Sequence, residues 1–171
     1  MELFEAIQTR RSIRRFRQDE VPRNKVRIIL ESAILAPSEG NLQSWRFYVV
    51  TNRKVKEELA AAALDQEFVA QAPVVIAVCT DLQAVAPYGR RGRELYALQS
   101  TAAAIENMLL TAVSQDLGAC WVGAFKEDQA RRILNLKTTV RPVALVAVGY
   151  PAEEPPARGR TPVEAVSVHV E

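Results

Sequence analysis

The sequence predicts one domain that combines helices and strands, with helices covering a central β-sheet. Its 171 residues suffice for one domain with a hydrophobic core, and the sequence contains no internal repeat. The stretch 74–79 is apolar throughout, which is typical of a strand buried on both faces. Apolar residues also repeat with the period of a helix, at 26–34 and again at 98–112. We therefore expect one domain over residues 1–171, in which residues 151–171 form an extended C-terminal arm.

The composition limits the function classes. Hydrophobic residues make up 49% and charged residues 25%, which is ordinary for a soluble globular protein. The net charge of +2 is small for a protein that binds a nucleic acid backbone, so we expect no nucleic-acid partner. No apolar run approaches the ~20 residues that cross a bilayer, and the acidic N-terminus is unlike a signal peptide. We expect no membrane partner.

The cysteines and the histidine argue against several kinds of catalytic site. Cys79 and Cys120 lie far apart in apolar surroundings and form no Cys-x-x-Cys pair. We expect both to be buried, reduced thiols in a cytoplasmic protein. His169 is the only histidine, which leaves little for a His-based metal site or a Ser-His-Asp triad. We expect no metal site.

The first helix with a clear apolar face follows Pro22. Apolar residues at positions 26, 29, 30, 33 and 34 share one side of it, and Pro37 prevents its continuation. Residues 81–93 have no clear period, and we expect a mobile loop near the ligand. The other elements follow in this order: a strand at 46–50, a short helix around 55–59, a strand at 74–79, a long helix at about 94–117 that Gly118 stops, an extended stretch at 119–123, a short helix at 127–134 and a strand at 143–148.

The end of the chain suggests contact with a second subunit. A helix over 94–117 would be about 36 Å long, which is more than a small domain needs, so part of it should face a partner. After a proline-rich linker, Val166, Val168 and Val170 alternate with polar residues. This alternation predicts a half-buried strand. Such a strand must pair with an edge of its own sheet or of a partner's sheet.

A basic segment near the N-terminus is the first candidate for ligand binding. It follows a short amphipathic helix with Leu3, Phe4 and Ile7 on its apolar side, and it reads RRSIRRF at 10–16. Arginine offers a planar fork of donors that suits phosphate, and serine offers a small hydroxyl. Arginines also favour the last turn of a helix because they complement its dipole. That alternative explains the first two arginines better than it explains the serine and the arginines that follow.

Other polar groups can complete a pocket around this segment. Arg158 and Arg160 can help to clamp a phosphate if the two ends of the chain converge, and the side-chain amides of Asn41 and Gln43 match the edge of a flat heterocycle. The backbone at 121–123 can approach a ligand closely because it contains a glycine. The sequence contains neither of the two common phosphate-binding loops of nucleotide-binding proteins, Gly-x-x-x-x-Gly-Lys and Gly-x-Gly-x-x-Gly. Together these groups predict a site for a phosphorylated heteroaromatic cofactor, although each residue also has a purely structural interpretation.

These motifs, in this order, resemble the FMN-dependent nitroreductase family. The resemblance rests on RRSIRRF at 10–16, APSEGNLQSW at 36–45, GACWVG at 118–123 and the Arg-x-Arg-x-Pro sequence at 158–162, and it covers nearly the whole chain. The chain departs from the family pattern at Ser44, where proline is usual, and at Ser100, where an acidic residue often stands. The segment between the central strand and the long helix is short, and in relatives this region helps to shape the substrate pocket.

The resemblance implies a fold and an assembly. The fold is α+β, with a central mixed β-sheet flanked by helices. The assembly is an intertwined homodimer in which the C-terminal strand is exchanged and the arm 151–171 reaches the partner subunit. Two FMN molecules lie at the subunit interface, which the long helix lines.

The resemblance also implies the cofactor-binding residues. The arginines and the serine of the segment at 10–14 hold the FMN phosphate and the pyrimidine edge, and the arginines at 158 and 160 complete the phosphate site. The backbone at 121–123 approaches the isoalloxazine ring. The segment at 37–43 comes from the other subunit. The implied residues are Arg10, Arg11, Ser12, Arg14, Pro37, Ser38, Asn41, Gln43, Trp121, Val122, Gly123, Arg158 and Arg160. No catalytic side chain is implied, because N5 of FMN carries the chemistry, and we hypothesise that Arg14 stabilises the reduced ring electrostatically.

The activity that the resemblance implies is NAD(P)H oxidation by a flavin oxidoreductase. NAD(P)H reduces FMN, and the flavin then passes electrons to a nitroaromatic, a quinone, a flavin or a similar small-molecule acceptor, so that the two substrates alternate. Three alternatives stay open. The same scaffold hosts reductive dehalogenation and flavin fragmentation, a flavin-binding protein without reductase activity would share the motifs, and a nucleic-acid binder would use the arginine clusters.

Overall fold

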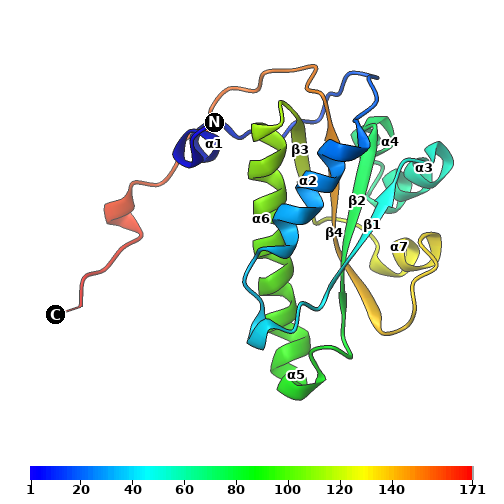
Figure 1. Ribbon diagram of the computed structural model, residues 1–171, viewed down its shortest axis with the longest axis vertical. Helices are drawn as coiled ribbons and strands as arrows, with labels where there is room; N and C mark the ends of the chain where they lie inside the picture. The colour runs from blue at the N-terminus through cyan, green and yellow to red at the C-terminus, as the bar shows by residue number, and fades with distance from the viewer. Residues whose placement is uncertain (171) are drawn as a thin grey trace.

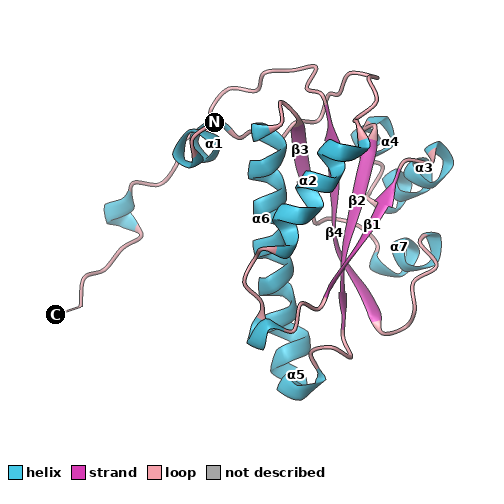
Figure 2. Ribbon diagram, in the orientation of Figure 1, coloured by secondary structure: helices cyan, strands magenta, loops and turns pink. Residues whose placement is uncertain are grey.

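The structure, a computed structural model, describes residues 1–170 and is built on one four-stranded sheet with helices on both faces (Figures 1 and 2). The strands are β1 (Trp45–Val50), β2 (Val74–Asp81), β3 (Gly118–Val122) and β4 (Val140–Gly149), and their spatial order is β1-β2-β4-β3. The strands predicted at 46–50, 74–79 and 143–148 are confirmed, and so is the extended stretch at 119–123. The architecture is α+β, as expected.

Two layers of helices cover the sheet (Figure 1). Helices α2 (Arg23–Ile34) and α6 (Ala97–Ser114) lie on one face, and α3 (Arg53–Ala62), α4 (Glu67–Gln71) and α7 (Glu127–Ile133) lie on the other. Alternate residues of β2 enter two separate hydrophobic cores. Val74, Ile76 and Val78 pack toward α2 and α6, whereas Val75, Ala77 and Cys79 belong to the core on the opposite face. The prediction that this strand is covered on both faces is confirmed.

The remaining elements are short. They are α1 (Leu3–Thr9), α5 (Gly89–Arg91), three 3₁₀ turns (Glu39–Asn41, Ala86–Tyr88 and Val163–Ala165) and a π-helical turn (Gly92–Tyr96). Within residues 1–170, no helix combines the length and the apolar character needed to cross a bilayer.

The sheet differs in strand direction from the mixed sheet that was expected. All three pairings between the named strands are antiparallel, and a single bridge between Ser12 and Ala119 is parallel. Helices α3 and α4 pack against each other and return the chain to the end of the sheet where β1 finishes. Val50 therefore pairs with Val75, and β2 runs back along β1. By contrast, β2 and β3 both run antiparallel to β4, so they are parallel to each other and are joined by a crossover through α6.

The long helix begins and ends differently from the prediction. The π-helical turn precedes α6, and residues 81–93 form helical turns around the buried Val85 instead of an open loop. Gly118 does not stop the helix. The chain leaves α6 through Asp116, which has a positive φ of 60°, and Gly118 is already the first residue of β3.

The predicted C-terminal strand is absent from the described chain. The arm leaves the sheet after β4 and runs away from it (Figure 1), and Val166, Val168 and Val170 are 71–91% exposed. A strand needs an edge for its backbone hydrogen bonds, and within residues 1–170 the segment 163–170 pairs with no strand. Glu171 lies outside the described residues. Leu3 and Phe4 on α1, which were expected on an apolar side, are also exposed.

The deep burial of Cys79 generates a prediction about thiol chemistry. This side chain is fully buried in β2, and burial raises the pKa of its thiol from 9.0 to about 12. Cys120 is also buried, as predicted. We expect neither thiol to react with DTNB at pH 8 in the native protein, and both to react after unfolding.

The raised pKa of Cys79 also makes the free energy of unfolding depend on pH. Between pH 9 and 12 the unfolded chain loses the thiol proton that the folded chain keeps, so this group makes the free energy of unfolding fall as pH rises. A Cys79→Ala variant should lack that component of the fall. The raised pKa of Cys79 would be contradicted if DTNB labelled the native protein rapidly. It would also be contradicted if the free energy of unfolding of wild type and of Cys79→Ala depended on pH in the same way.

Candidate functional site

The basic segment lies across the ends of β3 and β4. Its backbone forms a parallel bridge from Ser12 to Ala119 and an antiparallel bridge from Phe16 to Pro151. The Ile13 N–H donates to the Ala119 carbonyl at 3.0 Å. Ile13 and Phe16 are buried, while the arginines between and beside them are partly or fully exposed. The segment is thus fixed to the sheet by its apolar residues and presents its cations to solvent.

Two glycines allow this close approach. A Cβ atom at Gly118 would lie 2.5 Å from Cγ1 of Ile13, and one at Gly149 would lie 3.0 Å from Cδ1 of Phe16 and 2.6 Å from Cδ of Pro73. All three distances are well below ordinary carbon–carbon contact. The sequence motif at 118–123 therefore begins with a glycine for a packing reason.

The arginines have different partners. Nε of Arg10 lies 3.8 Å from Oε1 of Glu106 on α6, and the guanidinium of Arg11 donates to the carbonyls of Gln8 and Arg10. The guanidinium of Arg14 forms no ion pair with a carboxylate within residues 1–170. It lies 5.9 Å from the ring centroid of Phe68. Arg10, Arg11 and Arg14 therefore keep donors for an anion, although Arg10 shares its charge with a carboxylate.

Glu153 holds the backbone of the basic segment. Its Oε1 accepts hydrogen bonds from the N–H groups of Arg14, at 2.5 Å, and of Arg15, at 3.0 Å. The Ala152 N–H donates to the Arg15 carbonyl at 2.9 Å. The start of the C-terminal arm and the basic segment are thus tied together, although only the first residues of the arm take part.

The basic segment contacts the stretch at 118–123 through the bridge from Ser12 to Ala119. Burial raises the pKa of the Cys120 thiol, and the nearby Arg14 charge and the Ser12 side chain oppose the rise. In the same strand Val122 is buried, Trp121 is 39% exposed, and Gly123 follows the strand on the surface. The structure therefore brings Ser12 and Arg14 together with β3.

The segment 37–43 forms a tight turn with unusual backbone angles. Gly40, Asn41 and Gln43 have positive φ values of 49°, 56° and 50°. The Gln43 N–H donates to Oγ of Ser38 at 3.1 Å, and the Asn41 N–H donates to the Ser38 carbonyl at 3.1 Å. A non-glycine residue in this region costs about 1–2 kcal/mol, so contacts around the turn must offset that cost. Pro37, Asn41 and Gln43 are exposed and Ser38 is half-buried.

This turn and the basic segment lie at opposite ends of α6 (Figure 1). Glu39 in the turn contacts Ser100 near the start of the helix, whereas the basic segment packs against Gly118, just beyond its end. An 18-residue helix is about 27 Å long. One chain therefore does not bring these two groups of predicted site residues together.

Arg158 and Arg160 lie on the exposed part of the arm. Within residues 1–170, the guanidinium of Arg160 donates only to the carbonyls of Arg158 and Gly159, at 3.4 and 3.2 Å. The convergence of the two chain ends that the sequence suggested is found for residues 150–153 and is not found for these two arginines.

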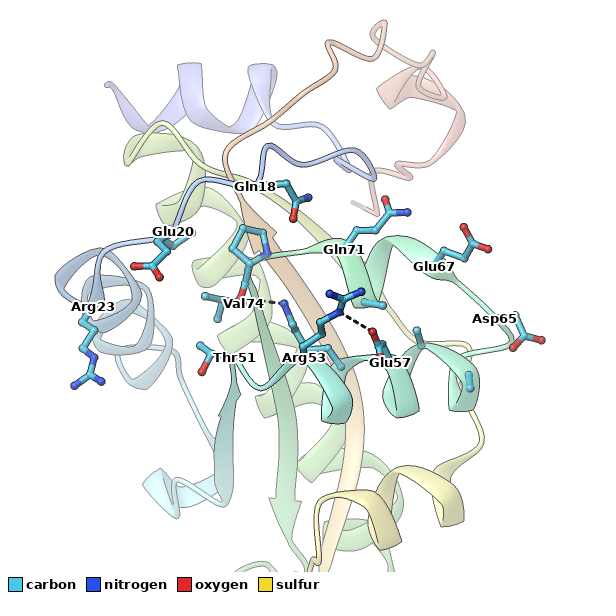
Figure 3. Close-up of a pocket in the computed structure, with 16 residues that line it drawn as sticks. Gln18, Glu20, Arg23, Thr51, Arg53, Glu57, Asp65, Glu67, Gln71 and Val74 are labelled. Carbon is cyan, nitrogen blue, oxygen red and sulfur yellow. Dashed lines mark hydrogen bonds and ion pairs between the residues drawn. The ribbon is translucent and has the colours of Figure 1, made fainter.

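A cavity on the α3 and α4 side of the sheet contains none of the predicted site residues (Figure 3). It has a volume of about 900 Å³ and lies between α3, α4 and the segment that leads into α2. Charges of both signs line it, including the ion pair of Arg53 and Glu57. Nζ of the buried Lys56 donates to the carbonyls of Ala72 and Pro73, and burial lowers the pKa of this lysine. Its donors are used for the end of α4, so the cavity offers no unpaired buried group to a ligand.

A second cavity, of about 410 Å³, includes two predicted residues, Pro37 and Ser38. None of its other lining residues was among the predicted cofactor-binding residues: Glu39, Tyr88, Tyr96, Gln99, Ser100 and Ala103. The rings of Tyr88 and Tyr96 meet edge to face, with centroids 5.5 Å apart. Besides Pro37 and Ser38, two signals in the sequence pointed toward this cavity: the expectation that residues 81–93, which include Tyr88, lie near the ligand, and the departure from the family pattern at Ser100.

A comparison with protein-family models decides the family. The model described as "Nitroreductase family" matches residues 7–67 and 62–150, which include the basic segment, the turn and all four strands. The chain belongs to the nitroreductase family.

Individual nitroreductase relatives agree with this assignment. An "NADH dehydrogenase" of Thermus thermophilus is 35% identical over 92% of this chain and 90% of its own length. An "FMN reductase (NADPH)" of Bacillus subtilis is 28% identical over 95% of this chain and 71% of its own length. The crystal structure of a nitroreductase family protein from Streptococcus pneumoniae has a TM-score of 0.92 at 25% identity, and the match covers 99% of this chain and 100% of that one. The predicted nitroreductase fold and oxidoreductase class are confirmed.

The contact between Gly118 and Ile13 predicts a stability effect at the candidate site. A Gly118→Ala substitution forces a methyl group against Ile13, and overpacking of this kind costs about 1–3 kcal/mol. Denaturant titration should show that loss, because the basic segment must shift away from β3. Gly159→Ala is the matched control, since no atom lies within 4 Å of a Cβ there, and it should change stability by less than about 0.5 kcal/mol. Equal stability of both variants would contradict the packing described for the segment.

Proposed function

We propose that this nitroreductase-family chain is an FMN-dependent NAD(P)H oxidoreductase that works as a homodimer. One observation carries the proposal: a fixed segment presents three arginines and a serine beside the exposed end of β3. Two relatives support it by their names: one is called an FMN reductase (NADPH) and the other an NADH dehydrogenase. The proposed acceptor is a nitroaromatic, a quinone, a flavin or a similar small molecule.

The residues present suit a flavin mononucleotide. Arg10, Arg11 and Arg14 supply guanidinium donors for phosphate or for the carbonyl–nitrogen edge of the ring, and Ser12 supplies a hydroxyl next to them. The segment is held by Ile13, Phe16 and Glu153, so binding does not have to order it. We assign Arg158 and Arg160 to the phosphate, because their exposed guanidinium groups stand on an arm whose start is bonded to the basic segment.

FMN, when bound, supplies the hydride and electron transfer, and the side chains supply binding, orientation and charge. Arg14 is the residue we propose to stabilise the negative charge of the reduced ring, since it has no carboxylate partner within residues 1–170 to neutralise it. The backbone at 121–123 is proposed to lie against the ring, with Val122 anchoring that backbone in the core.

The turn at 37–43 is proposed to serve the site of the other subunit. Within one chain, helix α6, which is about 27 Å long, separates this turn from the basic segment. In a dimer, the turn of the second subunit can lie beside the basic segment of the first. Pro37, Ser38, Asn41 and Gln43 would then complete the site, with the two amides facing the heterocycle.

The surface of the single chain suits such an assembly. Leu3, Phe4 and Ile7 on α1 are exposed, and so are the valines of the C-terminal arm. Strand β1 has β2 as its only neighbour among the described strands, so one of its edges is open, whereas the outer side of β3 carries the Ser12 bridge. We propose that the arm of one subunit pairs with the β1 edge of the other.

An absorption spectrum tests the cofactor and the first half of the reaction. The purified protein should show oxidised-flavin bands, and anaerobic addition of NADH or NADPH should bleach them. Bands that persist with both donors would leave a flavin-binding protein without reductase activity. No bands after incubation with FMN would refute the proposal. A panel of nitroaromatic, quinone, flavin and halogenated acceptors, with product analysis, then separates reduction from dehalogenation and flavin fragmentation.

Truncation of the arm tests the assembly. The full-length chain should sediment at about twice its mass of 19.0 kDa. A chain that ends at Thr161 keeps Arg158 and Arg160 but loses the valines, and it should dissociate and bind FMN at least ~tenfold more weakly, which is ~1.4 kcal/mol. A full-length His169→Ala variant is the control, because that exposed side chain leaves the valines in place. A truncated chain that remains dimeric with unchanged FMN affinity would exclude the exchanged arm.

A further inference from the structure

A cluster of hydroxyl groups surrounds the carboxylate of Glu39. Oε2 accepts a hydrogen bond from the Ser100 hydroxyl of α6, and Oε1 accepts one from the Ser44 hydroxyl at 3.0 Å. Ser44 in turn accepts a hydrogen bond from the Thr80 hydroxyl of β2 at 3.2 Å. Ser44 and Thr80 are fully buried and Ser100 is nearly so. A single carboxylate from the turn is therefore bonded directly to α6 and to the start of β1, and through Ser44 to β2.

The backbone of the turn is fixed by the same cluster. The Glu39 N–H points to Oγ of Ser100 at 3.4 Å, the Ser44 carbonyl accepts the Asp81 N–H at 2.8 Å, and the Leu42 N–H donates to the Glu39 carbonyl at 2.9 Å. On the other side, a Cβ at Gly40 would lie within 2.4 Å of the Tyr88 hydroxyl. The turn is thus held between Tyr88 on one side and the hydroxyl cluster on the other.

This anchoring explains how the turn keeps its strained conformation. Asn41 and Gln43 are the two residues whose side chains project from the turn, and both have positive φ. Such angles persist only where the surroundings determine them, and they are common at ligand sites. The hydrogen bonds that the exposed Gln43 side chain makes within residues 1–170 reach only as far as the neighbouring Asn41 carbonyl, so they do not fix the turn. The fixed point is Glu39, two residues before Asn41.

We propose that Glu39 is a positioning residue for the cofactor site: its carboxylate, bonded to Ser100 and Ser44, fixes the turn that presents Asn41 and Gln43. The two serines are the positions at which the sequence departs from the family pattern. In this chain the carboxylate of the contact is on the turn and the hydroxyl is on the helix. The effect on FMN rests on the proposed function, whereas the effect on the turn does not.

Hydrogen exchange of the protein without FMN tests the positioning by itself. Glu39→Ala should make the backbone N–H groups of 39–44 exchange at least ~tenfold faster, because the carboxylate no longer holds the turn, while exchange in β2 and β4 stays unchanged. Glu94→Ala is the matched control, since Glu94 forms an exposed ion pair with Arg90 and should leave 39–44 unaffected. Unchanged exchange of 39–44 in Glu39→Ala would overturn the proposal.

Exchange of the two side chains provides a rescue. In a Glu39→Ser, Ser100→Glu double variant, the carboxylate and the hydroxyl still face each other with reversed origins. We expect slow exchange of 39–44 to return to within ~threefold of wild type, while each single variant stays fast. A double variant as fast as the singles would show that packing alone, and not this carboxylate–hydroxyl pair, holds the turn, and would also overturn the proposal.

FMN titration connects the positioning to the cofactor. In Glu39→Ala the dissociation constant of FMN should rise at least ~tenfold, and the double variant should recover most of this loss. Wild-type affinity in Glu39→Ala, together with a loosened turn, would overturn the part of the proposal that concerns the cofactor. If the wild-type protein binds no FMN but its turn loosens in Glu39→Ala, the proposed function fails and the positioning of the turn stands.

Discussion

Burial of β2 and β4 on both faces is the constraint on which the rest of the structure depends. Each strand sends alternate side chains into two hydrophobic cores, one under α2 and α6 and the other under α3, α4 and α7. Both faces of the sheet centre are therefore used for packing, and no polar site can form there. Ligand-binding groups are left with the ends of the strands and the turns, which is where the basic segment and the turn at 37–43 lie.

Periodicity was sufficient to locate the elements that bury a continuous face. Helix α2 and the strands β2 and β4 were predicted because each presents an unbroken apolar stripe to a core. Strand β4 nevertheless extends past the prediction to Val140, because a bulge opposite Val78 and Cys79 accommodates Pro142. The alternation of valines near the C-terminus predicted a strand that the described chain lacks. Alternation shows which side chains favour burial, but it does not show whether an edge lies within reach.

The candidate site was predictable only in part. The motifs located the basic segment and the stretch at 118–123, because each is local in the sequence and rich in distinctive residues. The bridge that joins them, from Ser12 to Ala119, is long-range and only the structure revealed it. Glu39 was not predicted, since its partners Ser44 and Ser100 are 5 and 61 residues away and nothing in the local pattern marks a glutamate as a hub. The role of Gly118 was assigned wrongly for the same reason. A glycine after a helix usually ends it, and only the packing of Ile13 explains this one.

The open edge of β1 and the exposed valines of the arm also affect how the protein is made. On a ribosome the edge, at residues 45–50, emerges well before the valines between 163 and 170. An unpaired edge can join the wrong chain during that interval. Pro155, Pro156 and Pro162 interrupt the arm just before the valines and lower its tendency to form β-sheet aggregates. Because aggregation through an open edge depends on how many chains expose that edge at once, a low expression level favours folded protein over inclusion bodies.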